Sequence, residues 1–214
     1  MTTVYLPNDK KNFFEDISKN VIGIDEVGRG ALCGPVVSCS VLLDKSILEH
    51  PLVQEINDSK KISEKKRDLL SDFIKKFSTY SFGIAENQEI DKINILKATI
   101  LSMQRSFEKF KDYDNIVKID GQKTFELNKN TVFIIKGDQK SVSIAAASIL
   151  AKNHRDSFMK EMSKTFPEYE WGKNKGYGTM NHMNAIKKFG VTPLHRESFL
   201  KKLNFRHRQP YRDL

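Results

Sequence analysis

The chain has 214 residues and a formal net charge of +9, because 36 lysines and arginines outnumber 27 aspartates and glutamates. Hydrophobic residues make up 39% of it, which supports a normal core and excludes wholesale disorder, while no apolar run approaches the ~20 residues of a membrane span. Cys33 and Cys39 form neither a CxxC pair nor a disulfide ladder, and no signal peptide is recognisable, so we expect a cytoplasmic protein without a membrane partner.

The first half of the chain predicts strands that alternate with helices. The apolar, β-branched runs 21–24 and 36–43 are typical of two strands that pair as a hairpin through Gly34-Pro35. Apolar residues at helical spacing predict a helix over 63–77, and a strand over 79–85 follows it. Buried strands and amphipathic helices are thus mixed along the chain.

A single helix is expected over 90–110. Its inward face is predicted to carry Ile93, Leu96, Ile100, Leu101 and Phe107.

The second half continues the alternation. The sequence predicts strands over 115–120 and 131–136, a long helix over 141–166 and a short helix over about 181–189. This order indicates an α/β domain over residues 1–170, with a central mixed β-sheet flanked by helices. Residues 171–214 are expected to form a small basic helical segment on or near the active-site cleft.

The positive charge is concentrated at the C-terminal end. Residues 173–214 carry ten basic and two acidic residues, a net charge of +8, which leaves +1 for the first 172 residues. A clustered positive field is typical of a protein that neutralises phosphates. The alternative is a solvated segment that only aids solubility.

Acidic residues follow three of the strand-like runs: Asp25 with Glu26, then Asp120, then Asp138. Ligands of α/β sheets gather outside strand ends, so these carboxylates could converge although they are distant in sequence. Four carboxylates in one place repel one another unless cations neutralise them, and oxygen ligands suit Mg²⁺ and Mn²⁺. The pattern therefore indicates a site for two ions, which can activate water for phosphodiester hydrolysis.

Each acid also has a simpler interpretation. An acid after a strand is commonly a solvated turn residue. Asp138 or Ser141 could also cap the helix that follows, a role compatible with metal binding.

Short motifs with a fixed order extend this picture. They are Asp25-Glu26-Val27-Gly28-Arg29-Gly30, Asp58-Ser59-Lys60-Lys61, Asp120-Gly121, Lys136-Gly137-Asp138, the alanine-rich segment 145–152, Lys175-Gly176-Tyr177-Gly178-Thr179 and the segment 192–199. From Ile22 to Phe199 the chain resembles bacterial ribonuclease HII. The resemblance implies an RNase H-like fold and a divalent-metal endonuclease acting on RNA within a DNA duplex.

The resemblance also implies site residues. The family's metal-binding and catalytic acids fall on Asp25, Glu26, Asp120 and Asp138, and its substrate contacts fall on Gly28, Arg29, Gly30, Lys60 and Tyr177. In this family the glycine turn contacts the ribonucleotide–deoxynucleotide junction, and the tyrosine packs against the neighbouring sugar. Glycine allows close backbone approach, and its amide can hydrogen-bond a 2′-hydroxyl.

The expected reaction cleaves RNA in RNA/DNA hybrids and on the 5′ side of ribonucleotides embedded in duplex DNA. It would use Mn²⁺ or Mg²⁺ and leave a 3′-hydroxyl and a 5′-phosphate, as in ribonucleotide excision and RNA primer removal. We expect a monomer and predict no specific protein partner. Two alternatives remain open: a nucleic-acid-binding module without catalysis, and a metal-dependent phosphatase of small phosphate esters.

Four further residues are expected to lie outside the reaction itself. Arg155 and Asp156 are expected to form an ion pair within the long helix. His182 and His195 are expected to be structural or to face phosphates, because metal ions would already supply the activated water.

Overall fold

A computed structural model describes residues 11–57 and 59–202, and a five-stranded mixed sheet forms its centre. The strands are β1 (Ile22–Val27), β2 (Val36–Leu43), β3 (Ser78–Ala85), β4 (Val117–Asp120) and β5 (Thr131–Ile134). Their order is β3-β2-β1-β4-β5, with antiparallel pairing from β3 to β1 and parallel pairing from β1 to β5. The predicted hairpin of β1 and β2 and the predicted mixed sheet are confirmed.

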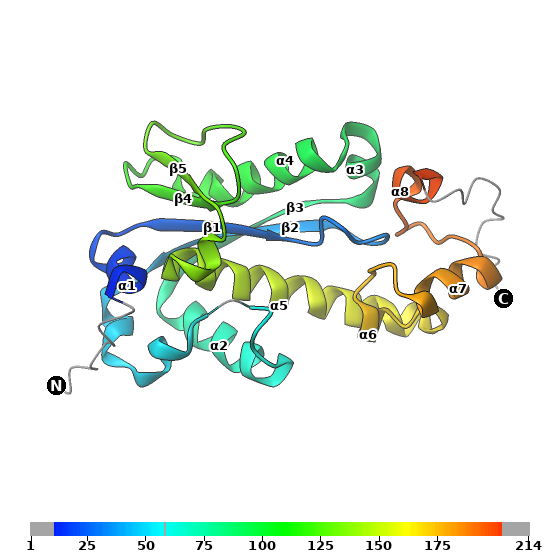
Figure 1. The fold of residues 1–214 in the computed structure, drawn as a ribbon, viewed down its shortest axis with the longest axis horizontal. Helices are drawn as coiled ribbons and strands as arrows, with labels where there is room; N and C mark the ends of the chain where they lie inside the picture. The colour runs from blue at the N-terminus through cyan, green and yellow to red at the C-terminus, as the bar shows by residue number, and fades with distance from the viewer. Residues whose placement is uncertain (1–10, 58, 203–214) are drawn as a thin grey trace.

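Helices cover both faces of the sheet (Figure 1). They are α1 (Lys11–Ser18), α2 (Glu64–Lys76), α3 (Asn87–Ile93), α4 (Ile95–Phe107), α5 (Val142–Thr165), α6 (Trp171–Asn174), α7 (Met180–Phe189) and α8 (Glu197–Lys202). Short 3₁₀ helices occupy Lys45–Glu49, Pro51–Glu55, Glu108–Phe110, Gly137–Gln139 and Pro167–Tyr169. Helix α5 packs on β1 and β2 from one side, with α2 against it, while α4 packs on β2 and β3 from the other.

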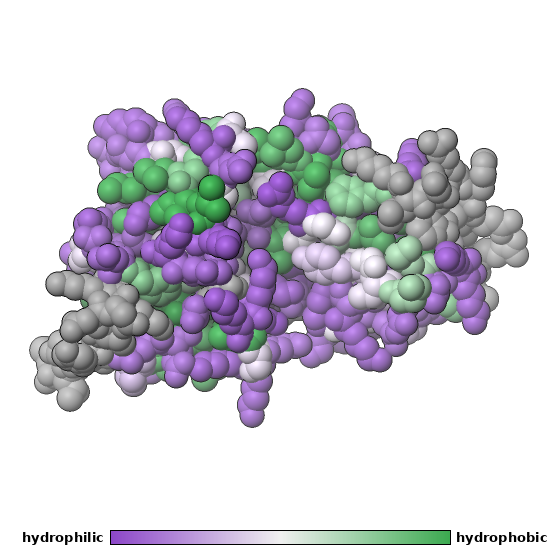
Figure 2. Space-filling view, in the orientation of Figure 1, coloured by the Kyte–Doolittle hydropathy of each residue, from purple (hydrophilic) through white to green (hydrophobic). Residues whose placement is uncertain are grey.

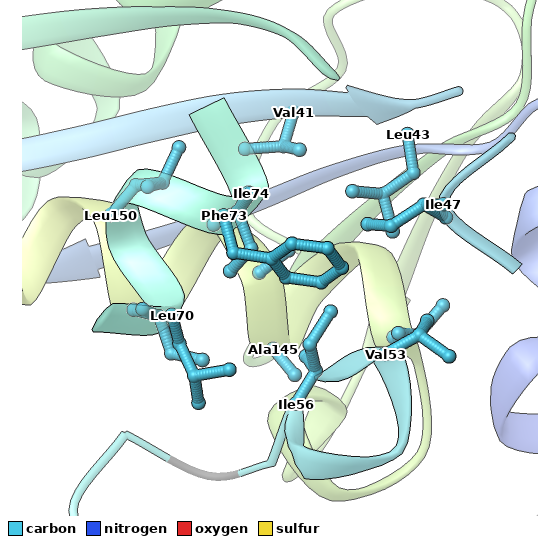
Figure 3. Close-up of a cluster of buried hydrophobic side chains, with 14 of the residues drawn as sticks. Val41, Leu43, Ile47, Val53, Ile56, Leu70, Phe73, Ile74, Ala145 and Leu150 are labelled. Carbon is cyan, nitrogen blue, oxygen red and sulfur yellow. The ribbon is translucent and has the colours of Figure 1, made fainter. Parts of the chain in front are cut away.

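The α5 side of the sheet holds a large apolar cluster, part of which is drawn in Figure 3. Val41 and Leu43 from β2 meet Phe73 and Ile74 from α2, and Ala145 places α5 beneath them. Strand β1 contributes a glycine to this face. A Cβ on Gly23 would lie 2.1 Å from the Ser143 carbonyl carbon, so α5 touches the strand backbone directly. Glycine at position 23 therefore allows the first turn of α5 to lie directly on β1.

The α4 side is lined partly by hydroxyl groups. Ser38 and Ser40 of β2 hydrogen-bond Ser102 and Ser106 of α4, at 2.6 and 2.8 Å between Oγ atoms. A Cβ on Gly83 of β3 would lie only 1.9 Å from the Ser102 carbonyl oxygen. Small residues thus bring this helix close to the sheet, and paired hydroxyls satisfy the buried polar atoms.

The single helix predicted over 90–110 is wrong in two respects. Asn94 adopts a positive φ of 70° and ends α3, and its side chain then accepts hydrogen bonds from the amides of Leu96 and Lys97 to begin α4. Leu96, predicted to face inward, is 48% exposed. The buried face of α4 contains Phe107, as predicted, and also Ser102 and Ser106, which meet serines of the opposing sheet surface.

The helices predicted over 63–77, 141–166 and about 181–189 are confirmed as α2, α5 and α7, whereas α1 and α6 were not predicted. Ser63 caps α2 and Ser141 caps α5, each by accepting a hydrogen bond from an amide of the first turn. Helix α7 ends at Gly190, whose φ is 91°.

Helices α6–α8 lie at one end of the molecule. Leu32 and Met159 join Trp171, Ile186 and Leu200 in one buried cluster, so these helices share a core with the main domain. The division of the chain at residue 170 stays a prediction. In the part of the chain that the structure describes, no helix has the length and apolar character to traverse a bilayer.

The contact between Gly23 and α5 generates the first prediction. Gly23→Ala should lower the free energy of unfolding by about 2–3 kcal/mol, because the new methyl group would collide with the α5 backbone. Gly172→Ala is the matched control, since its Cβ would lie 3.5 Å from Ser163 Oγ, in ordinary contact. Urea unfolding measures both, and equal stabilities would contradict the packing described.

Candidate active site

Two acids of the predicted set lie inside a strand rather than after it. Asp25 and Glu26 belong to β1, which pairs with β2 through Val27, whereas its pairing with β4 ends at Ile24 opposite Ile119. Asp120 is the next residue of β4 and the last of that strand. The parallel register thus places Asp120 beside Asp25 where the β1–β4 ladder ends.

The electrostatics of Asp25 and Glu26 show that these acids and Asp120 influence one another. Burial raises the pKa of Asp25 well above its usual value, and the charges of Glu26 and Asp120 raise it further. Burial also raises the pKa of Glu26, an effect that Arg29 opposes and Asp120 reinforces. Ser148 of α5 hydrogen-bonds the Asp25 carboxyl group and acts in the opposite direction.

Asp138 lies apart from the strand ends, in the 3₁₀ turn Gly137–Gln139 between β5 and α5. Its side chain is buried, with 7% exposure. The preceding residue contacts the acid group directly, since the Gly137 amide donates a 2.6 Å hydrogen bond to Asp120 Oδ1. Ser141, rather than Asp138, caps α5. The capping role that the sequence left open thus falls to Ser141, and Asp138 lies next to Gly137, which contacts Asp120.

Glu26 and Asp120 open onto a cleft of about 450 Å³ on the α4 side of the sheet. Arg29 and Gln122 add polar groups to its wall. Its remaining lining residues are Leu96, Thr99, Ile100, Met103, Gly121, Thr124, Phe125 and Phe133. The carboxylates of Glu26 and Asp120 thus lie at the edge of a partly apolar cleft.

The donor set suits a hard cation that binds in an open site. All the candidate ligands are carboxylate oxygens, which Mg²⁺ and Mn²⁺ prefer. Among residues 11–57 and 59–202, no three His, Cys, Asp or Glu side chains lie close enough together to hold a metal ion by themselves. Mg²⁺ is commonly held by one or two carboxylates together with water and substrate phosphate, so an open arrangement fits it. The mutual repulsion at Asp25 and Glu26 is what a bound cation would relieve.

The predicted glycine turn adjoins the acids. Gly28 has a φ of 94°, and a Cβ there would lie 2.3 Å from Arg155 Nε, so this position requires glycine. Arg29 is exposed and its guanidinium lies 3.3 Å from Glu26 Oε1. A Cβ on Gly30 would lie 3.9 Å from Tyr177 Cε1. The structure thus brings the turn and the predicted tyrosine together beside Glu26.

The expected ion pair of Arg155 with Asp156 is wrong. Arg155 instead donates to the backbone carbonyls of Pro35, Lys175 and Cys33, at 2.9, 2.8 and 3.0 Å. Neighbouring residues of a helix point in different directions, and Arg155 faces the turn while Asp156 faces α2.

Asp156 helps to hold the loop that carries Lys60. It pairs with Arg67 at 3.3 Å, and Arg67 also donates to the Ser59 carbonyl at 3.0 Å. Ser59 Oγ lies 2.9 Å from Ser148 Oγ, the same hydroxyl that contacts Asp25. Lys60 itself is exposed. The sequence motif pointed to this loop but did not reveal that Ser148 connects it to the acids.

The two histidines are structural, as expected. His182 is fully buried, receives a 3.0 Å hydrogen bond from Trp171 Nε1 and contacts the Tyr177 carbonyl at 2.9 Å through Nδ1. His195 is also buried and lies 3.2 Å from His182 between Nε2 atoms. Burial lowers the pKa of His182, which favours the neutral ring.

The basic C-terminal residues do not all lie on the surface. Arg196 is fully buried and Lys175 is 9% exposed, so these two do not contribute to an open phosphate-binding surface. Lys187, Lys188 and Lys201 are exposed. Arg206, Arg208 and Arg212 lie outside the described residues.

Hydrophilic side chains predominate on the face drawn in Figure 2. A hydrophobic patch interrupts them on the left, over β4 and β5. Exposed apolar residues on and beside these strands include Ile116, Val132 and Ile135.

Comparison with known proteins identifies the family. The ribonuclease HII family model matches residues 22–206. The ribonuclease HII of Caldanaerobacter subterraneus subsp. tengcongensis is 44% identical over 91% of this chain and 79% of the relative. That of Pelagibacter ubique is 47% identical over 85% of this chain and 96% of the relative.

Solved structures share the fold. The ribonuclease HII of Archaeoglobus fulgidus, solved in complex with PCNA, superposes with a TM-score of 0.73 at 21% identity, over 88% of this chain and 98% of that one. Bst-RNase HIII in complex with Mn²⁺ superposes with a TM-score of 0.66 at 18% identity, over 93% of this chain and 70% of that one. With this RNase H-like fold and these relatives, the chain belongs to the ribonuclease HII family and is a ribonuclease H.

Proposed function

We propose that the enzyme incises duplex DNA on the 5′ side of an embedded ribonucleotide, and cleaves the RNA of RNA/DNA hybrids, in a reaction that requires Mg²⁺ or Mn²⁺. The products would be a 3′-hydroxyl and a 5′-phosphate. The observation that carries the proposal is the position of the mutually repelling Asp25, Glu26 and Asp120 directly beside the Gly28–Gly30 turn and Tyr177.

Each residue then has a distinct task. Asp25, Glu26, Asp120 and Asp138 would hold two divalent ions, which supply Lewis acidity for hydrolysis of the phosphodiester. The Gly137 amide fixes the Asp120 carboxylate through its 2.6 Å hydrogen bond.

Recognition would fall to the neighbouring groups. The Gly28–Gly30 turn offers backbone amides to the 2′-hydroxyl, and the Tyr177 ring offers a flat surface to the adjacent sugar. Arg29 and Lys60 are exposed cations that can contact phosphates. The exposed Lys187, Lys188 and Lys201 would extend the contact to the duplex backbone.

The cellular role would be removal of misincorporated ribonucleotides and of RNA primers. We expect such an enzyme to act where the DNA is, which for a bacterial cell is the cytoplasm, and to act as a monomer.

Neutralising an acid tests the mechanism. Asp25→Asn and Asp120→Asn should each lower incision of a duplex with a single ribonucleotide by at least about a hundredfold, since each removes a charge that holds the ions. Product gels with Mg²⁺ or Mn²⁺ measure the rate, and gel-shift assays measure duplex binding, which should persist.

Three outcomes would contradict the proposed function. Undiminished incision by the variants would refute the roles of these acids. Duplex binding by the wild type without incision would indicate a binding module, and turnover of a small phosphate ester alone would indicate a phosphatase.

Cation binding should change the free energy of unfolding. Without divalent ions, Asp120→Asn should raise the free energy of unfolding by roughly 0.5–1 kcal/mol, because it removes a charge that disfavours ionised Asp25 and Glu26. Added Mn²⁺ should stabilise the wild type more than the variant. Thermal unfolding in chelator and in Mn²⁺ measures both, with Asp114→Asn, on the exposed pair with Lys129, as control. Equal stabilisation by Mn²⁺ of all three proteins would argue against a site at Asp120.

A substitution of Tyr177 distinguishes substrate recognition from metal binding. Tyr177→Ala should lower kcat/KM at a single ribonucleotide by roughly tenfold to a hundredfold, the loss expected when an aromatic contact of about 1.5–3 kcal/mol is removed. Mn²⁺ affinity, measured by calorimetry, should be unchanged. Tyr113→Ala, at another partly exposed tyrosine, is the control. If Mn²⁺ affinity collapsed with activity, Tyr177 would be a structural residue.

A further inference from the structure

Two buried arginines hold the segment that contains the glycine turn. Arg155 donates to the carbonyls of Cys33 and Pro35, as described above. Arg196 donates through Nε to the Gly34 carbonyl at 2.9 Å, and through Nη1 to the carbonyls of Arg29 at 3.0 Å and Ala31 at 2.8 Å. Five carbonyls between residues 29 and 35 therefore point inward, toward two guanidinium groups.

The neighbouring backbone explains what this orientation achieves. The described peptide bonds are all trans, so the carbonyl of Arg29 and the amide of Gly30, which share one peptide plane, point in opposite directions. Arg196 draws that carbonyl into the protein, and the Gly30 amide consequently points outward, at an exposed residue. Within the described segments no backbone hydrogen bond uses the Arg29 or Gly30 amide.

Arg155 acts on the other recognition element. Its guanidinium carbon lies 5.5 Å from the centroid of the Tyr177 ring, and it also donates to the Lys175 carbonyl at 2.8 Å. A positive charge at this distance attracts the aromatic face. The ring is thus held against the position of Gly30, since a Cβ there would be 3.9 Å from Tyr177 Cε1.

The identity of these two residues matters. Both are fully buried, and within residues 11–57 and 59–202 neither forms an ion pair. Burying an arginine without a carboxylate partner costs free energy. Its presence at both positions is therefore explained by a role that a neutral side chain could not fill. Its planar set of donors can hold several carbonyls at fixed angles, whereas a lysine presents one ammonium. The adjacent charge also polarises the Arg29–Gly30 peptide and strengthens the Gly30 amide as a donor.

We propose that Arg196 and Arg155 are positioning residues for ribonucleotide recognition: Arg196 turns the Gly30 amide outward to hydrogen-bond the 2′-hydroxyl, and Arg155 holds the Tyr177 ring beside it. This inference rests on the proposed function, because it assigns a purpose to the same turn. It concerns discrimination of sugars, and leaves the acids and their ions unaffected.

The test compares two duplexes that differ in a single 2′-hydroxyl. Dissociation constants in chelator, for DNA with one ribonucleotide and for the same all-DNA duplex, give a discrimination ratio without cleavage. Arg196→Lys should lower this ratio by about threefold to tenfold, the value of one hydrogen bond, while affinity for the all-DNA duplex and for Mn²⁺ is retained. Arg155→Lys should lower the ratio similarly through Tyr177.

Arg67→Lys is the matched control. Arg67 is a buried arginine that also donates to backbone carbonyls, but to those of Ser59 and Ile62. This variant should weaken binding of both duplexes equally and keep the ratio. A ratio unchanged in Arg196→Lys, or lowered as much in Arg67→Lys, would overturn the inference.

If a variant does not fold, a measurement on the wild type tests the same inference. The Gly30 amide resonance should shift on binding the ribonucleotide duplex and not on binding the all-DNA duplex, and the absence of such a difference would overturn the inference. Failure of the proposed function is distinguishable. In that case the wild type would neither incise nor prefer the ribonucleotide duplex, whatever the arginine variants do.

Discussion

The structure depends on a parallel register that brings like charges together. Ile24 pairs with Ile119, and the next residues along the two strands are Asp25 and Asp120. Burial and mutual repulsion raise the pKa of Asp25, so the fold holds this arrangement at a cost in stability. Such a site is suited to binding cations, because a cation would relieve the repulsion between the carboxylates. The remaining contacts of the core keep the two strands in register.

The core maintains the site through close backbone contacts. Gly23 lets α5 lie on β1, and this places Ser148 against both Asp25 and Ser59. The loop with Lys60 and the acids are thereby connected through one hydroxyl of one helix. The side chain of Arg155, which also belongs to α5, holds the segment that contains the turn. Helix α5 is thus the common support for the acids, the turn and the loop.

Sequence patterns predicted the features that depend on local chemistry. The glycine turn, Asp120 at the end of β4 and Ser141 as the cap of α5 lie where their local signatures predict, whereas Asp25 and Glu26 lie inside β1. The break at Asn94 was missed because apolar spacing continues across it. The partners of Arg155 and Arg196 could not be predicted, since backbone carbonyls far along the chain carry no residue-type signal.

The central claim is that Asp25, Glu26, Asp120 and Asp138 form one cation site. Paramagnetic broadening of backbone amide resonances by substoichiometric Mn²⁺ tests it most directly in the free enzyme. The account predicts that the amides of residues 25–27, 120–121 and 137–138 broaden first and together, and recover when excess Mg²⁺ displaces Mn²⁺. Broadening that spares these amides, or that reaches 25–27 without 137–138, would contradict a single four-carboxylate site.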